Sequence, residues 1–265
     1  MFDRFGRKIN YLRISVTDRC NQRCYYCMPK SGITLIKHEE VLSYEEILSM
    51  TTEFVEMGID KVRLTGGEPL VRRGIVSLVA MLSGIEGIKD LSMTTNGVLL
   101  PEYGEDLRKN GLDRINVSLD SINSESYKKI TNTDRLDDVL KGLKAVEKAG
   151  FNPIKLNCVI KKSREEKDAQ EVAEFAYKNG FDIRFIRMMN IEKGEFWLVE
   201  GGNGGDCKNC NRLRLTSDGR LFPCLFSDIS FSVKELGVEK ALRLALNHKP
   251  ESGKAANNKF YGLGG

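Results

Sequence analysis

Seven cysteines are the residues of this sequence whose spacing points most directly to chemistry. Six fall into two groups of three, with the motifs Cys20-x-x-x-Cys24-x-x-Cys27 and Cys207-x-x-Cys210-x13-Cys224. The two histidines, His38 and His248, lie far from both groups in the sequence, so any metal site built on these groups is mostly sulfur-ligated. Thiolate sets of this kind hold iron–sulfur clusters or zinc.

The first group lies in a loop that directly follows a predicted strand. Three thiolates can bind three irons of a [4Fe–4S] cube and leave the fourth iron open to a small molecule. A structural zinc site needs a fourth protein ligand, and none lies nearby. With Tyr26 before the last cysteine, the spacing matches the CxxxCxΦC signature of radical S-adenosylmethionine (SAM) proteins. The alternatives are a zinc loop or three buried cysteines.

The second group is interrupted by a predicted β-hairpin over residues 213–226, with Ser217-Asp218-Gly219 as its turn. Cys224 then returns beside the CxxC, so the three thiols could converge. Zinc with a fourth ligand from elsewhere is one occupant of such a site. The seventh cysteine, Cys158, lies in the apolar run KLNCVI and is expected to be a small buried hydrophobe.

The elements that position these groups alternate between strand and helix. A capping box at Ser43 and Glu46 begins one helix, which Gly58 ends; two further helices end at Gly150 and Gly180. A last helix is predicted from Val233 to His248. The expected strands are Leu12–Asp18, Val62–Thr65, Leu91–Thr95, Ile115–Leu119, Lys155–Ile160 and Ile183–Arg187.

Alternation of this kind predicts a parallel sheet in an α/β fold. Six units are too few for a closed eight-stranded barrel, so we expect an open partial (βα)6 TIM-type barrel. Residues 1–189 would form the barrel. Residues 190–265 would form a small C-terminal cluster-binding region that ends in a glycine-rich tail.

Composition limits the class of partner. The chain has 265 residues, 41% of them hydrophobic, and a net charge of +4, which is typical of a globular protein. It has no run of about 18 apolar residues and no secretory pattern at its start, so we expect a cytoplasmic protein without a membrane partner. The charge is too small to indicate nucleic-acid binding, but it suits a small anionic substrate.

Basic residues lie on or beside the predicted strands, where a charge is costly unless it is paired or faces a polar cavity. These residues are Arg13, Lys61, Arg63, Lys155 and Arg184. As a set they suggest a barrel interior that receives an anion, although each could instead form a surface salt bridge. Gly66-Gly67-Glu68-Pro69 follows the second strand, where glycines let the backbone approach a ligand. The alternative is an ordinary turn.

Several segments together resemble the GTP 3′,8-cyclases of molybdenum cofactor biosynthesis, a radical SAM family. They are DRCNQRCYYCMP, KVRLTGGEPLVRR, MTTNGVLL, RINVSLDS, CNRLRLTSDGRLFPCLF and a terminal Gly-Gly. The resemblance implies a lyase that converts GTP to 3′,8-cyclo-7,8-dihydro-GTP with SAM and two [4Fe–4S] clusters. It also implies an electron donor such as a flavodoxin or ferredoxin, and is compatible with a homodimer.

The same resemblance assigns roles to residues. Cys20, Cys24 and Cys27 would bind the first cluster, and Cys207, Cys210 and Cys224 the second. Contacts with SAM are implied for Tyr26, Gly66, Gly67, Glu68, Ser118 and Met189. Contacts with GTP are implied for Arg13, Arg63, Thr94, Lys155, Arg184, Arg212 and Arg214. Arg13 and the terminal Gly264 and Gly265 would take part in catalysis.

The sequence departs from this family in one segment. Only 17 residues separate Met189 from Cys207, fewer than the family has, and Arg187 replaces a usual glutamate. A related two-cluster radical SAM enzyme acting on another nucleotide or on a peptide is therefore the alternative. The second alternative is a non-enzymatic protein, either an iron–sulfur electron carrier or a zinc-binding scaffold. Neither of these needs the GGEP segment or a serine at the position of Ser118.

Overall fold

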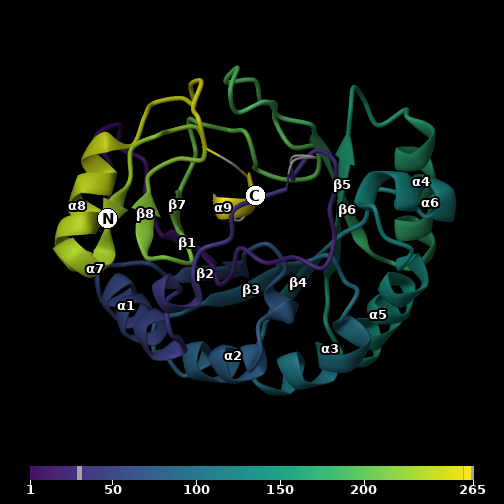
Figure 1. Cartoon of the computed structure of the whole chain (residues 1–265), viewed down its shortest axis with the longest axis horizontal. Coiled ribbons are helices and arrows are strands. Elements are labelled where there is room, and N and C mark those ends of the chain that lie inside the picture. The colour runs from purple at the N-terminus through teal and green to yellow at the C-terminus, as the bar shows by residue number, and fades with distance from the viewer. Residues whose placement is uncertain (29–31, 259, 264–265) are drawn as a thin grey trace.

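The computed structural model describes residues 1–28, 32–258 and 260–263. Their strands form one nine-stranded sheet in the order β6-β5-β4-β3-β2-β1-β7-β8-β9, curved into an open barrel (Figure 1). The first seven strands pair in parallel, and β8 and β9 are antiparallel. The bounds are β1 Tyr11–Ser15, β2 Lys61–Thr65, β3 Asp90–Thr95, β4 Arg114–Ser118, β5 Ile154–Ile160, β6 Asp182–Arg187, β7 Arg212–Leu215, β8 Arg220–Phe222 and β9 Phe231–Ser232.

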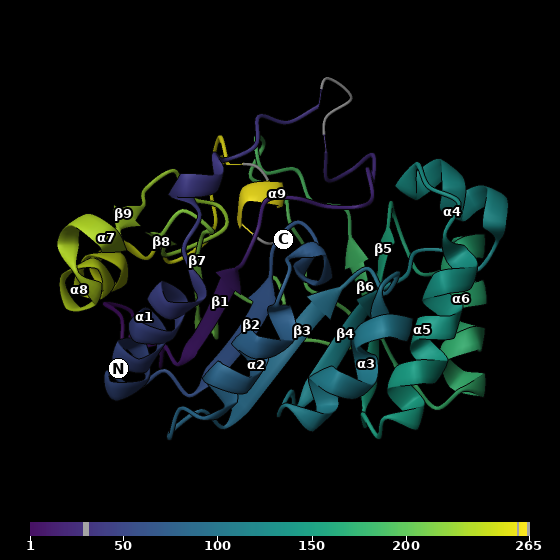
Figure 2. The ribbon, with the colours of Figure 1, turned by 60° about the horizontal axis from the view of Figure 1, so that its bottom comes forward.

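Most helices cover the outer face of this sheet, and the last one, Phe260–Leu263, lies on the concave side with the site (Figures 1 and 2). The bounds are α1 Tyr44–Glu56, α2 Ile75–Ser83, α3 Leu100–Lys109, α4 Ser124–Thr131, α5 Leu136–Lys148, α6 Lys167–Lys178, α7 Val233–Leu236, α8 Val238–His248 and α9 Phe260–Leu263, with single 3₁₀ turns at His38–Glu40 and Pro69–Val71. The expected open α/β barrel is confirmed. Residues 190–265 add three strands to the same sheet.

The helix starts show how local sequence sets these elements. The capping box before α1 is confirmed: Glu46 N–H donates to Ser43 Oγ at 3.1 Å, and Ser43 N–H donates to the Glu46 carboxylate at 2.6 Å. Ile47 and Phe54 on the inner side of α1 are fully buried against the sheet. Each such helix therefore packs its apolar stripe against the outer face of the sheet. The concave inner face of the sheet is left to polar residues.

Strand register brings the basic side chains together. Arg13 on β1 is paired with Arg63 on β2 and with Arg214 on β7. Laterally paired residues of a parallel sheet point to the same face, and their neighbours in sequence point to the other face. The flanking Leu12 and Ile14 are accordingly buried in the core. Alternation along three strands thus places three arginines in one row on the concave face.

The open side of the barrel, beyond β6, is covered by residues 190–206. The backbones of Phe185 and Glu200 exchange two hydrogen bonds of 3.1 Å, so this short segment adds to the edge of β6. A Cβ atom at Gly201 would lie 2.5 Å from the Ile183 carbonyl oxygen, so only glycine allows this close approach. Seventeen residues therefore suffice to cover the edge.

One prediction about the elements is corrected. The predicted helix from Val233 to His248 is not continuous, because Gly237 adopts a φ of +75° and separates α7 from α8. Helices α2 and α3 fill two places in the predicted strand–helix alternation, although no bounds were predicted for them, and α4 is an additional helix before α5. In the part of the chain that the structure describes, no helix is long and apolar enough to cross a membrane.

Candidate active site

Two cavities open on the concave face and share a wall. One, of about 220 Å³, contains the first cysteine group; we call it the cysteine-loop cavity. The other, of about 420 Å³, contains the basic residues and the second cysteine group; we call it the arginine cavity. The side chains that line both are Thr94, Asn157, Ile186 and Met189. A molecule in one cavity therefore reaches a molecule in the other across these four residues.

All the residues that the sequence assigned to the first cluster and to SAM line the cysteine-loop cavity. They are Cys20, Cys24, Tyr26, Cys27, Gly66, Gly67, Glu68, Ser118 and Met189. They come from the loop after β1, from the ends of β2 and β4, and from the residues beyond β6. Because the carboxyl ends of parallel strands meet at one edge of a sheet, residues far apart in the sequence converge here.

Gly66 and Gly67 hold the cysteine loop against the end of β2. Gly67 N–H donates to the Thr17 carbonyl at 2.7 Å, and Glu68 N–H donates to the Arg19 carbonyl at 2.8 Å. A Cβ atom at Gly67 would lie 2.3 Å from the Arg19 carbonyl oxygen, and one at Gly66 would lie 2.6 Å from that of Thr17. The glycines therefore place the loop that precedes Cys20.

Replacement of Gly67 by alanine is expected to displace this loop. The clash is with backbone, so the change should cost about 1–3 kcal/mol of stability and reduce iron binding by the first cysteine group. Gly84→Ala is the matched control, because its Cβ would be in ordinary contact at 3.5 Å from Met81 O. Iron analysis and thermal unfolding of both variants check this. Full iron binding by Gly67→Ala would show that the loop is not positioned by this contact.

The three cysteines of the first group are partly buried around this cavity. Burial raises the pKa of Cys20, of Cys24 and of Cys27, the last to about 11. Among residues 1–28, 32–258 and 260–263, no three His, Cys, Asp or Glu side chains are grouped closely enough to hold a single metal ion. A [4Fe–4S] cube takes each thiolate on a different iron, so its cysteines surround a cavity, as these do.

Two buried carboxyl groups complete this cavity. Glu68 is 1% exposed and accepts hydrogen bonds from Asn96 N–H at 2.6 Å, Thr95 Oγ1 at 2.7 Å and Leu70 N–H at 3.0 Å. Burial nevertheless raises its pKa to about 7. Asp120 accepts from the Tyr26 hydroxyl at 2.6 Å, and burial raises its pKa to about 6. Such carboxyls suit a ligand that brings positive charge and hydroxyl groups.

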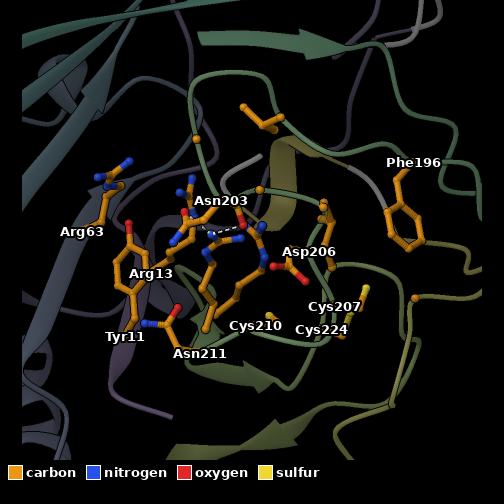
Figure 3. A pocket seen from close by; sticks show the side chains of 18 of the residues that line it. Tyr11, Arg13, Arg63, Phe196, Asn203, Asp206, Cys207, Cys210, Asn211 and Cys224 are labelled. Atoms are coloured by element: carbon orange, nitrogen blue, oxygen red, sulfur yellow. Dashed lines mark hydrogen bonds between the residues drawn. The ribbon is translucent and has the colours of Figure 1, made fainter. Parts of the chain in front are cut away.

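The arginine cavity contains all but one of the residues assigned to GTP (Figure 3). Arg13, Arg63, Thr94, Arg184, Arg212 and Arg214 line it. Lys155 does not line either cavity, because its ammonium forms an ion pair with Asp182 at the start of β6. Lys61 and Arg114 lie in the cavity instead, and Arg114 is paired with Asp90.

The arginines of this cavity are crowded enough to favour an anion. Burial lowers the pKa of Arg13 and of Arg63, and neighbouring arginine charges lower both further. Burial and the charge of Arg212 lower the pKa of Arg214 to about 10. Like charges held together in a partly dry space repel each other, and an anionic ligand relieves this repulsion. Arginine forks also match phosphate oxygens in geometry.

The second cysteine group lines the far part of the same cavity (Figure 3). Burial raises the pKa of Cys224. Burial acts to raise the pKa of Cys210, but the charges of Lys249, Arg212 and Arg214, together with a backbone hydrogen bond from Arg212, lower it overall. This group is therefore held in a positive environment, unlike the first.

The chain end lies against both cavities. Phe260 on α9 lines the cysteine-loop cavity, and the Leu263 carbonyl accepts from Arg214 Nη1 at 3.3 Å. Gly264 and Gly265, assigned to catalysis from the sequence, lie outside the described residues. The resemblance implies that the chain end lies in the site. The last described element, α9, lies inside the barrel (Figure 1).

Sequence reasoning missed several lining residues. Asn96 and Asp120 line the cysteine-loop cavity, and Asp206 and Lys249 line the arginine cavity. The sequence did carry a signal for Asp120 as a lining residue, because this carboxylate lies two residues beyond Ser118, at the end of β4. Lys249 directly follows α8 and gave none, because only the tertiary fold brings it to the cysteines.

Comparison with known proteins fixes the class. Residues 14–176 match the Radical SAM superfamily. The solved structure of native anSMEcpe with bound AdoMet has a similar fold, with a TM-score of 0.65 and 16% identity over 91% of this chain and 81% of that one. These observations, with the cysteine loop and its cavity, define a radical SAM fold.

Two curated relatives narrow the assignment. The GTP 3′,8-cyclase of Thermodesulfovibrio yellowstonii is 41% identical over 92% of this chain and 88% of its own length. That of Petrotoga mobilis is 36% identical over 98% and 97%. The chain belongs to the GTP 3′,8-cyclase family of the radical SAM superfamily. Membership of the superfamily implies a [4Fe–4S] cluster and SAM, and the residues of the cysteine-loop cavity fit both.

The first of these alignments also bears on chain length. It spans 289 positions, whereas this chain has 265 residues, so that relative carries residues that this chain lacks. Their place between Met189 and Cys207 stays a prediction.

Proposed function

We propose that this protein converts GTP to 3′,8-cyclo-7,8-dihydro-GTP, as its relatives' names indicate for them. In this reaction the ribose C3′ loses a hydrogen atom and bonds to C8 of guanine. The observation that carries the proposal is the wall shared by the two cavities. Thr94 Oγ1 and Asn157 Oδ1 on this wall are buried and have no hydrogen-bond partner among the described residues. Buried polar atoms are normally satisfied, so both indicate a polar ligand there.

The cysteine-loop cavity would hold the first cluster and SAM. Cys20, Cys24 and Cys27 would ligate three irons and leave one for SAM. Glu68 and the backbone of Gly66-Gly67 would bind the methionyl ammonium, and Tyr26, Ser118 and Met189 would contact the rest of SAM. When bound, these groups supply a 5′-deoxyadenosyl radical, which takes the hydrogen atom from the substrate.

The arginine cavity would hold GTP. Arg13 on β1 and Arg63 on β2 project from paired strands, and they would bind the triphosphate together with Arg184 on β6, with Lys61 beside them. Arg212 and Arg214 from β7, the strand that pairs with β1, would bind it beside Arg13. This placement directs the ribose toward Thr94 and the shared wall, where its C3′ faces the other cavity. Proximity set by rigid strands is what the protein contributes to the reaction.

We further propose a second [4Fe–4S] cluster on Cys207, Cys210 and Cys224, because their three thiols line the arginine cavity beside the expected guanine. Several further features remain proposals from the sequence. They are the division into residues 1–189 and 190–265, an electron donor such as flavodoxin or ferredoxin, a homodimer and a cytoplasmic location. The catalytic roles of Gly264 and Gly265 also remain proposals from the sequence.

Anaerobic incubation of the reconstituted protein with SAM, a reductant and GTP tests the proposed function. We expect GTP to be replaced by an isomer of the same mass that chromatography separates from it. ATP and a peptide should be recovered unchanged. If GTP is recovered intact while SAM is cleaved, the alternative of another nucleotide or a peptide substrate takes its place.

A further inference from the structure

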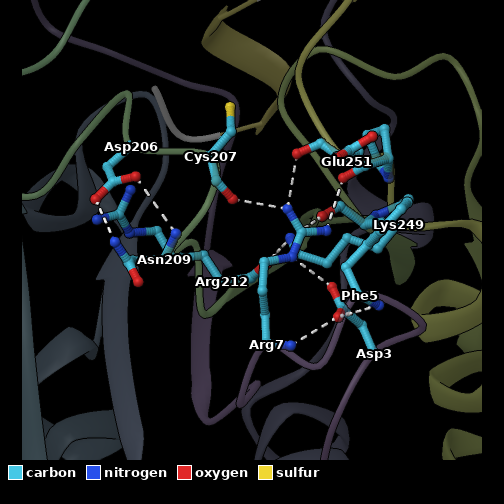
Figure 4. A network of polar contacts seen from close by, with 11 residues as sticks. Asp3, Phe5, Arg7, Asp206, Cys207, Asn209, Arg212, Lys249 and Glu251 are labelled. Carbon is cyan, nitrogen blue, oxygen red and sulfur yellow. Dashed lines mark hydrogen bonds and ion pairs between the residues drawn. The ribbon is translucent and has the colours of Figure 1, made fainter.

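Lys249 is a buried lysine beside the second cysteine group. It follows α8, is 1% exposed and lines the arginine cavity (Figure 4). Its Nζ donates to the Arg212 carbonyl and to the Pro223 carbonyl, each at 2.7 Å. Arg212 lies two residues after Cys210, and Pro223 lies directly before Cys224. One ammonium group thus links the two segments that carry the cysteines.

The charge of Lys249 meets no carboxylate counterpart among residues 1–28, 32–258 and 260–263. Among the described residues no Asp or Glu forms an ion pair with it. The charged groups that act on it most strongly are Cys210, Cys224 and Arg7. Burial of an uncompensated charge is costly, and proteins retain one where an anion is bound.

Arg7 fixes the segment that carries this lysine. Its guanidinium donates to the carbonyls of Cys207 at 2.7 Å, Pro250 at 2.7 Å and Glu251 at 2.9 Å (Figure 4). Its own charge is met by Asp3 at 2.6 Å. The chain start, the residues after α8 and the first cysteine of the group are therefore tied together. Asp3 is occupied by Arg7, so it does not neutralise Lys249.

We propose that Lys249 is the counter-charge of the iron–sulfur cluster held by Cys207, Cys210 and Cys224. A cube held by three thiolates carries net negative charge, which increases when the cluster gains an electron. A cation fixed beside it stabilises the cluster, and stabilises its reduced form most, so it raises the reduction potential. Lys249 is thus a positioning residue that acts through the cluster. This inference rests on the second cluster proposed above.

Lys249→Met tests the inference, because methionine keeps the length of the side chain and removes the charge. We expect the second cluster to lose iron to a chelator about 10–100-fold faster, as for other outer-shell partners of metal sites. We also expect its midpoint potential, followed by electron paramagnetic resonance, to become more negative. The potential is read in a Cys24→Ala background, where the second cluster is the one expected to remain. Lys249→Arg should restore both values, and Lys240→Met, at an exposed lysine of α8, should change neither.

The possible outcomes distinguish failure of the role of Lys249 from failure of the proposed second cluster. If the unmodified chain binds about four irons instead of about eight, the second cluster itself is absent. If the unmodified chain binds about eight irons, and Lys249→Met retains them with an unchanged midpoint potential of the second cluster, only the role of Lys249 is overturned. Loss of both clusters from Lys249→Met, or failure of Lys249→Arg to rescue, would also overturn that role. Either result would mean that the lysine supports the fold and not the charge of the cluster.

Discussion

Cys24→Ala is expected to abolish formation of 5′-deoxyadenosine from SAM. Cys24 lines the cysteine-loop cavity with Cys20 and Cys27 and is partly buried there. Without it, one iron of the cube has no protein ligand, and the cluster that binds SAM is not retained. Liquid chromatography of the nucleoside products, with the reconstituted chain as reference, measures the loss. We expect no 5′-deoxyadenosine above the level obtained without protein.

Cys158→Ala provides the matched control for this experiment. Cys158 is buried in β5 and does not line either cavity. Its removal leaves a small void of one sulfur atom, so the variant should keep its iron and its cleavage of SAM. If Cys158→Ala lost a cluster, or Cys24→Ala still cleaved SAM, the division of the cysteines would be wrong.

Arg214→Ala is expected to weaken GTP binding by about 1.5–3 kcal/mol, which is about 10- to 150-fold in Kd. Arg214 lies within the arginine cavity, is paired in register with Arg13, and meets the end of α9. Its side chain would make a charge-assisted hydrogen bond to a phosphate oxygen, which alanine cannot replace. Titration of GTP into the anaerobic protein measures the change.

Two controls distinguish a lost phosphate contact from a general loss of structure. SAM affinity should stay unchanged in Arg214→Ala, because SAM is expected in the other cavity. Arg220→Ala, on the neighbouring strand β8, removes an exposed arginine that donates to Ser230 Oγ at 2.9 Å, and should bind GTP normally. Equal loss of SAM and GTP affinity in Arg214→Ala would indicate misfolding and not a lost phosphate contact.

Much of the barrel could be predicted because its signals are local. Buried parallel strands appear as short apolar runs, and all six expected strands lie within one or a few residues of β1–β6. The capping box at Ser43 needs only two residues three positions apart. The first cysteine group is likewise contained in eight residues of one loop, so its convergence follows without knowledge of the fold.

The remaining features depend on tertiary contacts that no local pattern carries. Lys155 looks like its basic neighbours in the sequence, but strand register places it opposite Asp182, which takes its charge. Lys249 directly follows α8 and reaches the second cysteine group only through the fold. Gly237 could equally have been tolerated within a helix, and its φ of +75° does not follow from the local sequence.

Deuterium transfer from GTP labelled at ribose C3′ tests the central claim most directly. The claim is that the shared wall at Thr94 and Asn157 brings the ribose C3′ of GTP next to the SAM cavity. We predict that anaerobic turnover with SAM and a reductant yields 5′-deoxyadenosine carrying one deuterium, together with a cyclised nucleotide that has lost it. Unlabelled 5′-deoxyadenosine from the same incubation would show that C3′ is not the hydrogen donor and would contradict this account.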